Sequence, residues 1–405
     1  MTKSPCSPTR QCRLCGCSDL KEVIDFGFQA VANHFHSEPG KPIEKLPLRL
    51  IRCESCDLVQ LSDQIDMDIM YRNYWYRSGV NDTMREHLRH LAEHVKNDVA
   101  LEDGDVIIDI GSNDGTFLSY FPERCVRVGV DPSNVESSNC VRVRDYFTEK
   151  AIQKVLGNKK AKIITSIAMF YDVNDPKAFV RDVQSRLADD GVWIAELSYL
   201  PKMLSNRAYD SICHEHVAYY RLETFQRALE GSGFDIFRTE INDMNGSSFR
   251  VFMSRKGIRP VEPSVMEILS GERLRFVSPK PYEEFKAGVE WNSLRLLSFL
   301  DMTTALGKTV YGYGASTKGQ VILQFCSVTP DMIKGIAERN SRKYGLYTPA
   351  TDIPICSEDE MRDSRPDFLL IFPWYFLDEF LEREKPLRDQ GTKIVVPLPT
   401  FHVIR

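Results

Sequence analysis

The sequence predicts an α/β protein in which a small metal-binding module at the N-terminus precedes two doubly wound α/β units. Three observations predict this arrangement. Two Cys-x-x-Cys pairs lie within the first 56 residues, and two later stretches each alternate short β-branched runs with helix-length intervals. A chain of 405 residues is also too long for one ordinary core, because about 150 residues per domain gives roughly two to four domains.

The composition is that of a folded protein without a strong net charge. Hydrophobic residues make up 42% of the chain and charged residues 27%, and 52 Lys and Arg against 57 Asp and Glu leave a net charge of -5. These values exclude wholesale disorder. They also argue against a nucleic-acid partner, whose phosphates would require basic residues. No apolar run approaches the roughly 20 residues that span a bilayer, so we expect a cytoplasmic protein with no membrane partner.

The first 68 residues are predicted to form a zinc-binding module. Cys-x-x-Cys spacing lets two thiolates from one tight turn face a tetrahedral ion, and four thiolates leave no open position for chemistry. A redox pair or unmetallated packing cysteines remain alternatives. A strand-like stretch, 48–52, leads into the second pair, and the expected ligands are Cys12, Cys15, Cys53 and Cys56.

Residues 69–260 are predicted to form the first α/β unit. Met84, Leu88, Leu91 and Val95 recur at helical spacing. β-branched runs separated by helix-length intervals follow, which predicts a parallel sheet covered on both faces. The strand candidates are 106–110, 127–130, 161–164 and 191–195.

Residues 261–405 are predicted to form the second unit. A long helical region reaches about Leu306, and the alternation then resumes. The strand candidates are 308–312, 335–337, 367–372 and 393–396.

The turn 109–115, Asp-Ile-Gly-Ser-Asn-Asp-Gly, predicts a cofactor site at the end of a strand. Its glycines permit close approach of the backbone to a ligand, and Asp131 ends the next strand, where an acid can accept hydrogen bonds from ribose hydroxyls. Together they indicate S-adenosylmethionine. NAD fits less well because the third glycine of G-x-G-x-x-G is missing, and a bare structural turn is the alternative.

His214, Glu215 and His216 form the most chemically suggestive triplet. An imidazole can accept a proton near neutral pH, and a neighbouring carboxylate can orient it. A second metal site or two structural histidines are the alternatives. We favour acid/base catalysis because no third ligand with suggestive spacing follows.

The turn 312–319 also lies between a predicted strand and a predicted helix. Small residues and Lys318 at a helix N-terminus make an anion site. A second adenosyl cofactor or a merely structural turn are the alternatives.

Four motifs in this order resemble the S-adenosylmethionine-dependent sugar C-methyltransferases over essentially the whole chain. They are the paired Cys-x-x-Cys knuckle, the turn 109–115, the triplet 214–216 and the segment 311–319. The family methylates C-3 of nucleotide-linked 4-keto-6-deoxyhexoses. The resemblance implies a zinc-binding module, a class I methyltransferase Rossmann-like domain and a second, C-terminal Rossmann-like domain that holds the nucleotide sugar.

The resemblance also implies roles for individual residues. His216 corresponds to the base and Glu215 to its partner, with His214 and Tyr76 completing the expected catalytic set, although Tyr76 could equally belong to an aromatic cluster that packs domains together. Arg250, expected near the sugar, could be a solvated strand residue. The expected cofactor contacts are Tyr74, Ser78, Asp109, Gly111, Ser112, Asn113, Asp114, Gly115, Asp131 and Ser166. The expected substrate contacts are Cys213, Asp172, Asn245, Arg250, Ser316 and Lys318.

Two positions depart from the family pattern. Cys213 stands where the family tends to have tyrosine, and Asp172 where it tends to have histidine. A carboxylate cannot replace an imidazole without changing the acid/base balance, so the sugar, the carbon or the stereochemistry could differ.

The sequence therefore predicts a monomeric S-adenosylmethionine-dependent C-methyltransferase with a structural zinc ion and a nucleotide-sugar substrate, in deoxysugar biosynthesis. Methylation at oxygen or nitrogen is the alternative within enzymes. A zinc-module binding protein with a vestigial S-adenosylmethionine pocket is the alternative outside them.

Overall fold

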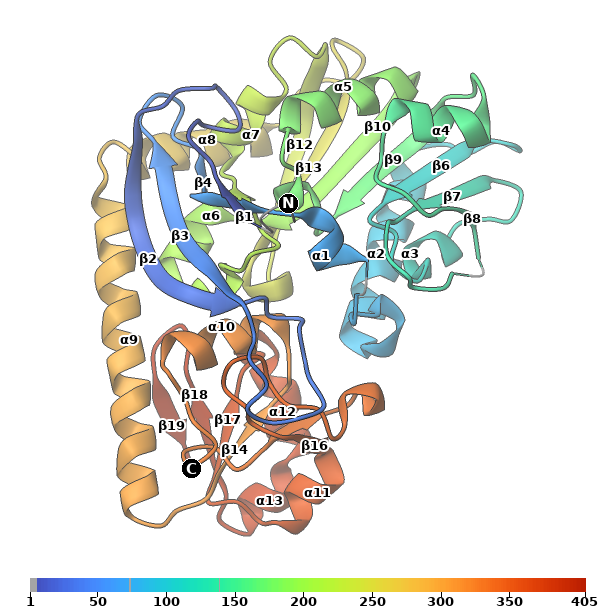
Figure 1. Cartoon of the computed structure of the whole chain (residues 1–405). Helices are drawn as coiled ribbons and strands as arrows, with labels where there is room; N and C mark the ends of the chain where they lie inside the picture. The colour runs from blue at the N-terminus through green and yellow to red at the C-terminus, as the bar shows by residue number, and fades with distance from the viewer. Residues whose placement is uncertain (1–5, 73, 138) are drawn as a thin grey trace.

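The computed structural model describes residues 6–72, 74–137 and 139–405, which build four sheets (Figure 1). The N-terminal module contains a small antiparallel pair, β1 (Cys6–Pro8) with β5 (Asp63–Ile65), followed by α1 (Met67–Tyr71). Its main sheet has the order β11-β4-β3-β2, all antiparallel. The strands are β2 (Leu20–Ala30), β3 (Lys45–Cys53), β4 (Val59–Leu61) and β11 (Ala218–Tyr219). Since β11 comes from the middle of the chain, the module is joined to the next domain by a shared sheet.

The middle domain has a seven-stranded sheet in the order β12-β13-β10-β9-β6-β7-β8. The predicted strands appear as β6 (Val106–Ile110), β7 (Val126–Val130), β9 (Ala161–Ile167) and β10 (Leu187–Ser198), and they are parallel with β8 (Val141–Val143). All five residues of β6 are buried, as expected for a strand covered on both faces.

The expectation of a wholly parallel sheet was wrong at one edge. β12 (Phe234–Asn242) and β13 (Ser248–Arg255) form an antiparallel hairpin, and β13 pairs antiparallel with β10. The hairpin turns through η4 (Met244–Gly246), where Asn245 and Ser247 both have positive φ. A tight connection of this kind can join only antiparallel strands, because a parallel pair needs a crossover.

Helices cover this sheet. The predicted helix begins one residue after Asn81, whose side chain accepts hydrogen bonds from the backbone N–H groups of Thr83 and Met84, as N-cap residues do. Its buried face packs Leu91 and Val95 against the sheet. The helices and short 3-10 turns are η1 (Ser78–Val80), α2 (Asp82–Asp98), α3 (Thr116–Ser119), α4 (Glu149–Leu156), η2 (Phe170–Asp172), α5 (Pro176–Arg186), α6 (Leu200–Ser205), η3 (Tyr209–Ser211) and α7 (Leu222–Ala228).

The long helical region that follows is two helices, α8 (Pro263–Arg275) and α9 (Lys280–Ala305). Pro279 and Pro281 lie at the break, where proline starts a helix more readily than it continues one. Val265 and Leu269 of α8 belong to the core of the middle domain, whereas α9 runs along β2 and the C-terminal domain (Figure 1). The boundary at 260/261 stays a prediction.

The C-terminal domain has a six-stranded sheet in the order β16-β15-β14-β17-β18-β19. Its strands are parallel except for the last pair. They are β14 (Val310–Tyr313), β15 (Ile336–Glu338), β16 (Ile355–Ser357), β17 (Phe368–Ile371), β18 (Lys393–Val396) and β19 (His402–Ile404). The helices are α10 (Thr317–Phe325), η5 (Ser341–Lys343), α11 (Glu358–Asp363), η6 (Trp374–Phe376), α12 (Leu377–Arg383) and α13 (Lys385–Asp389). Among the described residues, no helix combines the length and the apolar character needed to cross a bilayer.

Candidate active site

The four predicted cysteine ligands converge on one point in the N-terminal module. Their Sγ atoms all lie within 4.8 Å of one another. The Sγ atoms of Cys12 and Cys56 are 3.4 Å apart and those of Cys15 and Cys53 are 3.6 Å apart. Four thiolates at about 2.3 Å from a tetrahedral zinc ion lie about 3.8 Å from one another, so this set fits zinc closely. Four sulfur ligands close the coordination sphere, and the zinc site is structural.

A cavity of about 480 Å³ lies where the three parts of the chain meet. It extends from the carboxyl ends of β6 and β7 in the middle domain to those of β14 and β15 in the C-terminal domain. Fifteen of the predicted site residues line it: Tyr74, Tyr76, Ser78, Asp109, Gly111, Ser112, Asn113, Asp131, Asp172, Cys213, Glu215, His216, Asn245, Ser316 and Lys318.

The turn after β6 forms one end of the cavity. Asp131 Oδ2 accepts a hydrogen bond from the backbone N–H of Asn113 at 2.9 Å, and Asp131 Oδ1 accepts two from Ser133, one from its backbone N–H at 2.9 Å and one from its hydroxyl at 2.5 Å. A carboxylate has about four acceptor positions, so Asp131 keeps about one position, on Oδ2, for a ligand. Ser112 Oγ is buried without a partner among the described residues. An acid and an unpartnered hydroxyl beside a left-handed glycine, Gly111 with φ 75°, fit the ribose and the backbone approach of an adenosyl cofactor.

The Tyr74–Ser78 segment lies over this turn although it is distant in sequence. Asn113 Oδ1 accepts a hydrogen bond from the backbone N–H of Ser78 at 3.0 Å, and Asn113 Nδ2 donates one to the carbonyl oxygen of Tyr76 at 3.1 Å. Asp114 does not line the cavity; its carboxylate instead accepts a hydrogen bond from the N–H of Gly79 at 2.8 Å. Asn113 and Asp114 therefore hold a wall of the cavity in place.

Asp109 is a buried member of the same turn. Its Oδ1 accepts a hydrogen bond from Thr165 Oγ1 at 2.6 Å. Burial raises the pKa of Asp109 to about 7, so its side chain carries a full negative charge only above neutral pH.

His216 lines the cavity. Its Nδ1 is 2.8 Å from the carbonyl oxygen of Ser211, and because a carbonyl can only accept, Nδ1 carries the hydrogen. The neutral ring therefore has its lone pair on Nε2. Burial, assisted by the charge of Lys318, lowers the pKa of His216 to about 4. The ring packs on Tyr171 with centroids 4.2 Å apart.

Glu215 and Asp172 are neighbouring carboxyl groups in the same wall. Glu215 Oε1 accepts a hydrogen bond from Asn33 Nδ2 at 2.7 Å. Burial raises the pKa of Glu215. Burial and the charge of Glu215 raise the pKa of Asp172 well above its usual range.

Lys318 lies on the C-terminal side of the cavity, at the start of α10. Its Nζ donates a hydrogen bond to the carbonyl oxygen of Asn245 at 2.5 Å and lies 4.6 Å from the centre of the Tyr375 ring. Ser316 is the N-cap of α10 and accepts a hydrogen bond from the N–H of Gly319. Burial lowers the pKa of Lys318.

Five expected site residues do not line the cavity: His214, Asp114, Gly115, Ser166 and Arg250. His214 is buried with its Nε2 3.4 Å from the carbonyl oxygen of Leu46. Ser166 Oγ accepts a hydrogen bond from Trp193 Nε1 at 3.0 Å. Gly115 faces Ser137, with which a Cβ at position 115 would collide. These positions shape the site from behind its wall.

Arg250 is held away from the cavity by two carboxylates. Its guanidinium pairs with Glu196 at 2.7 Å and with Glu240 at 2.9 Å. Glu196 lines the cavity and also accepts a hydrogen bond from His87 at 2.6 Å. Burial acts to raise the pKa of Glu196, but His87 and Arg250 outweigh it and the pKa is lowered. Sequence reasoning missed Glu196. It is a single glutamate near the end of a buried strand, and its partners His87 and Arg250 are far away in the sequence.

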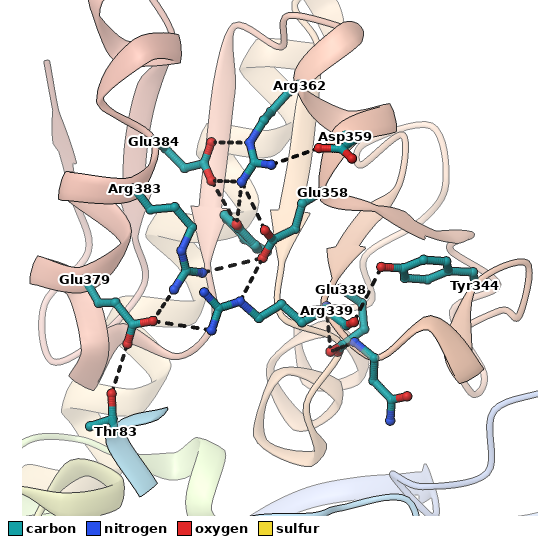
Figure 2. A network of polar contacts seen from close by, with 12 residues as sticks. Thr83, Glu338, Arg339, Tyr344, Glu358, Asp359, Arg362, Glu379, Arg383 and Glu384 are labelled. Carbon is teal, nitrogen blue, oxygen red and sulfur yellow. Dashed lines mark hydrogen bonds and ion pairs between the residues drawn. The ribbon is translucent and has the colours of Figure 1, made fainter. Parts of the chain in front are cut away.

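Figure 2 shows a network of ion pairs at the far end of the cavity, on the C-terminal domain. Arg383 pairs with Glu379, and Arg339 Nε lies 3.4 Å from Glu358 Oε1. Thr83 Oγ1, at the start of α2, donates a hydrogen bond to Glu379 Oε2 at 3.1 Å. This contact joins the start of α2 in the middle domain to α12 in the C-terminal domain.

Comparisons with known proteins agree with this architecture. Three family models match consecutive parts of the chain: a zinc binding domain at residues 12–71, a methyltransferase domain at 84–239 and a C-methyltransferase C-terminal domain at 243–399. C-methyltransferase NovU from Streptomyces niveus is 29% identical over 408 residues, covering 98% of this chain and 97% of its own.

Solved structures are less similar. Magnesium protoporphyrin IX methyltransferase from Synechocystis PCC 6803 with bound SAH has a TM-score of 0.34 and 13% identity, covering 47% of this chain and 92% of its own. N-methyltransferase NodS from Bradyrhizobium japonicum WM9 has a TM-score of 0.33 and 11% identity, covering 43% of this chain and 97% of its own.

The matches along the sequence confirm the resemblance seen in the motifs and favour carbon over oxygen or nitrogen as the methylated atom. The cysteine cluster and the matching zinc-binding domain confirm the structural zinc site. The chain is an S-adenosylmethionine-dependent C-methyltransferase.

Proposed function

We propose that the enzyme methylates C-3 of a nucleotide-linked 4-keto-6-deoxy sugar through an enolate, in deoxysugar biosynthesis, with His216 as the base. One observation carries the proposal. A neutral imidazole with a fixed tautomer lies in the wall of the cavity that Asp131 also lines, and its Nε2 has no hydrogen-bond partner among the residues that the structure describes.

Methylation at carbon needs a base, because a hydrogen next to a ketone is only weakly acidic. Ser211 fixes the His216 ring so that Nε2 accepts the α-hydrogen, and Tyr171 packs against the ring face. Removal of water around the base and the ketone strengthens every electrostatic interaction between them. The loss of one proton to Nε2 leaves the electron pair on the carbon that is to be methylated.

S-adenosylmethionine, when bound, supplies an electrophilic methyl group on a sulfonium. Asp131 would accept hydrogen bonds from its ribose, and Ser112 Oγ would regain a partner. The Tyr74–Ser78 segment, fixed by Asn113, would cover it from the opposite side. Tyr76, a residue that is 44% exposed and lines the cavity, would contact the donor or the sugar.

The C-terminal side of the cavity suits the nucleotide. Lys318 and the N-terminus of α10, capped by Ser316, would bind the diphosphate, because a helix N-terminus favours anions. Asn245, whose φ is 55°, presents its carbonyl oxygen to Lys318 and its side chain to the same region. Arg250 is not part of this proposal, because Glu196 and Glu240 already neutralise it.

Mass spectrometry of a panel of dTDP-, UDP- and GDP-linked 4-keto-6-deoxyhexoses, after incubation with the enzyme and methyl donor, tests the proposal. We expect one member to gain one CH₂, and fragmentation to place it at C-3. A methyl group on oxygen, or no gain in any 4-keto member while an unrelated acceptor is methylated, would contradict it.

A further inference from the structure

The carboxyl oxygens of Asp172 and Glu215 differ in whether they have a hydrogen-bond partner. Glu215 Oε1 accepts the hydrogen bond from Asn33 Nδ2, whereas Glu215 Oε2 and Asp172 Oδ1 have no hydrogen-bond partner in the part of the chain that the structure describes. Both residues line the cavity. A carboxyl oxygen shielded from water without a partner is costly, so these two atoms mark a place for a proton and for a polar group of the substrate.

The pair retains one proton more readily than two separate carboxyl groups would. Two adjacent carboxylates away from water do not both stay ionised. Burial and the charge of Glu215 raise the pKa of Asp172 well above its usual range, and a single hydrogen bond, from Tyr71, opposes that rise. Burial also raises the pKa of Glu215, but hydrogen bonds from the backbone, Cys213 and Asn33 oppose that rise. The negative charge therefore resides on Glu215 and the proton on Asp172.

The other titratable groups around Asp172 leave this distribution unchanged. Four tyrosines and one cysteine are neutral at pH 7, because burial raises the pKa of each side chain well above its ordinary value. They are Tyr71, Tyr74, Tyr171, Cys213 and Tyr219. His216, which packs on Tyr171, is also neutral above about pH 4. Glu215 is the charged group that faces Asp172.

Asn33 is fixed in an orientation that can only donate to Glu215. Its Oδ1 accepts a hydrogen bond from Thr317 Oγ1 of α10 at 3.1 Å while its Nδ2 donates to Glu215. A carboxylate cannot donate, so a flip of the amide would turn Oδ1 toward Glu215 and lose that hydrogen bond, whereas the Thr317 hydroxyl could accept as well as donate. Asn33 follows β2 in the zinc-binding module, and one amide thus joins the module, the catalytic loop and the C-terminal domain.

We propose that Asp172, as a carboxylic acid, donates its O–H to the substrate oxygen that gains charge during enolisation, and that Asn33 is the positioning residue that keeps the charge on Glu215. This inference rests on the proposed function, because it requires a ketone. As Nε2 of His216 takes the α-hydrogen as a proton, the C–H electron pair forms the C–C double bond and the carbonyl π pair moves to oxygen, facing the Asp172 O–H. When that carbon uses its electron pair to form a new bond, the carbonyl re-forms, Asp172 keeps its proton and His216 releases the other to solvent.

Exchange of the α-hydrogen in heavy water, measured without methyl donor on the panel member that the enzyme methylates, tests the inference. Asp172→Ala should slow exchange by about 10²-fold or more, the usual effect of removing one donor to a developing oxyanion. Asp172→Asn keeps a donor of the same shape. In the wild type, the exchange rate should decline at high pH as Asp172 ionises. Asp172→Asn should retain part of the exchange rate and should not show this decline.

Asn33→Ala should slow exchange at neutral pH and move that decline to higher pH, because removing a donor to the Glu215 anion makes the pair hold its proton more tightly. A purely structural role for Asn33 would lower the rate without moving the decline. Asp189→Asn is the matched control, since the Asp189 side chain is 88% exposed. Affinity for S-adenosylhomocysteine shows that each variant is folded.

Wild-type exchange in Asp172→Ala, or an unchanged decline at high pH in Asp172→Asn, would overturn the inference while leaving the proposed function intact. A wild-type enzyme that methylates a panel member but never exchanges its α-hydrogen would overturn both.

Discussion

His216 Nδ1 donates a hydrogen bond to the carbonyl oxygen of Ser211 at 2.8 Å, so that Nε2 is the basic nitrogen of a ring that lines the cavity. His216→Asn should therefore lower kcat by about 10²-fold or more, the usual scale for a lost general base, with little change in affinity for S-adenosylhomocysteine. Steady-state kinetics and calorimetry check this. His90→Asn, on the exposed face of α2, is the control, and an equal kcat in both variants would reject His216 as the base.

The loss of kcat/KM on the acid side should occur at an unusually low pH. A base works only when neutral, and burial lowers the pKa of His216 from 6.5 to about 4. The active form therefore persists below pH 6.5 and is lost only as the pH falls through about 4. We expect kcat/KM to stay level between about pH 5.5 and 7. A limb centred near 6.5 would mean that the ring is exposed to water in the working enzyme.

Asp131→Asn should weaken cofactor binding without destroying it. A hydrogen bond to a charged acceptor contributes about 1.5 to 3 kcal/mol, which corresponds to roughly a 10- to 150-fold loss of affinity for S-adenosylhomocysteine in a calorimetric titration. The same titration on Asp189→Asn should match the wild type. Equal affinity in Asp131→Asn would remove this carboxylate from the cofactor site.

Zinc should be needed for turnover as well as for folding of the N-terminal module. Cys53→Ser removes one of four ligands, and metal analysis should find well below one zinc ion per chain. Turnover should fall in parallel, because Asn33 of this module contacts Glu215. Cys17→Ser, whose sulfur lies outside the four-cysteine cluster, should retain both zinc and activity; full activity in zinc-free protein would contradict the link.

Lys318→Met should act on the substrate rather than on the donor. Its Nζ contacts the carbonyl oxygen of Asn245 and the ring of Tyr375, and methionine is an unbranched side chain one atom shorter than lysine that removes the charge. We expect KM for the nucleotide sugar to rise about 10-fold or more, with affinity for S-adenosylhomocysteine unchanged. A variant that instead loses affinity for S-adenosylhomocysteine would place Lys318 in the cofactor site.

Local sequence signals predicted much of the fold and part of the site. Cys-x-x-Cys spacing and β-branched runs depend on residues close in the chain, so the four-cysteine cluster and β6 could be found from sequence. Arg250 could not be placed, because its partners Glu196 and Glu240 come from two other strands. Nothing in the sequence indicated Asn33, because the two hydrogen-bond partners of its amide, Glu215 and Thr317, are both far along the chain. The β12–β13 hairpin was missed although its turn contains Asn245-Gly246, a dipeptide typical of hairpin turns.

The fate of the hydrogen at the methylated carbon tests the central claim most directly. A substrate that carries deuterium at C-3 is converted fully, and the product is analysed by mass spectrometry and NMR. The account predicts that the product gains the methyl group and loses the deuterium, and that His216→Asn does neither at a comparable rate. A methylated product that retains the C-3 deuterium would contradict it.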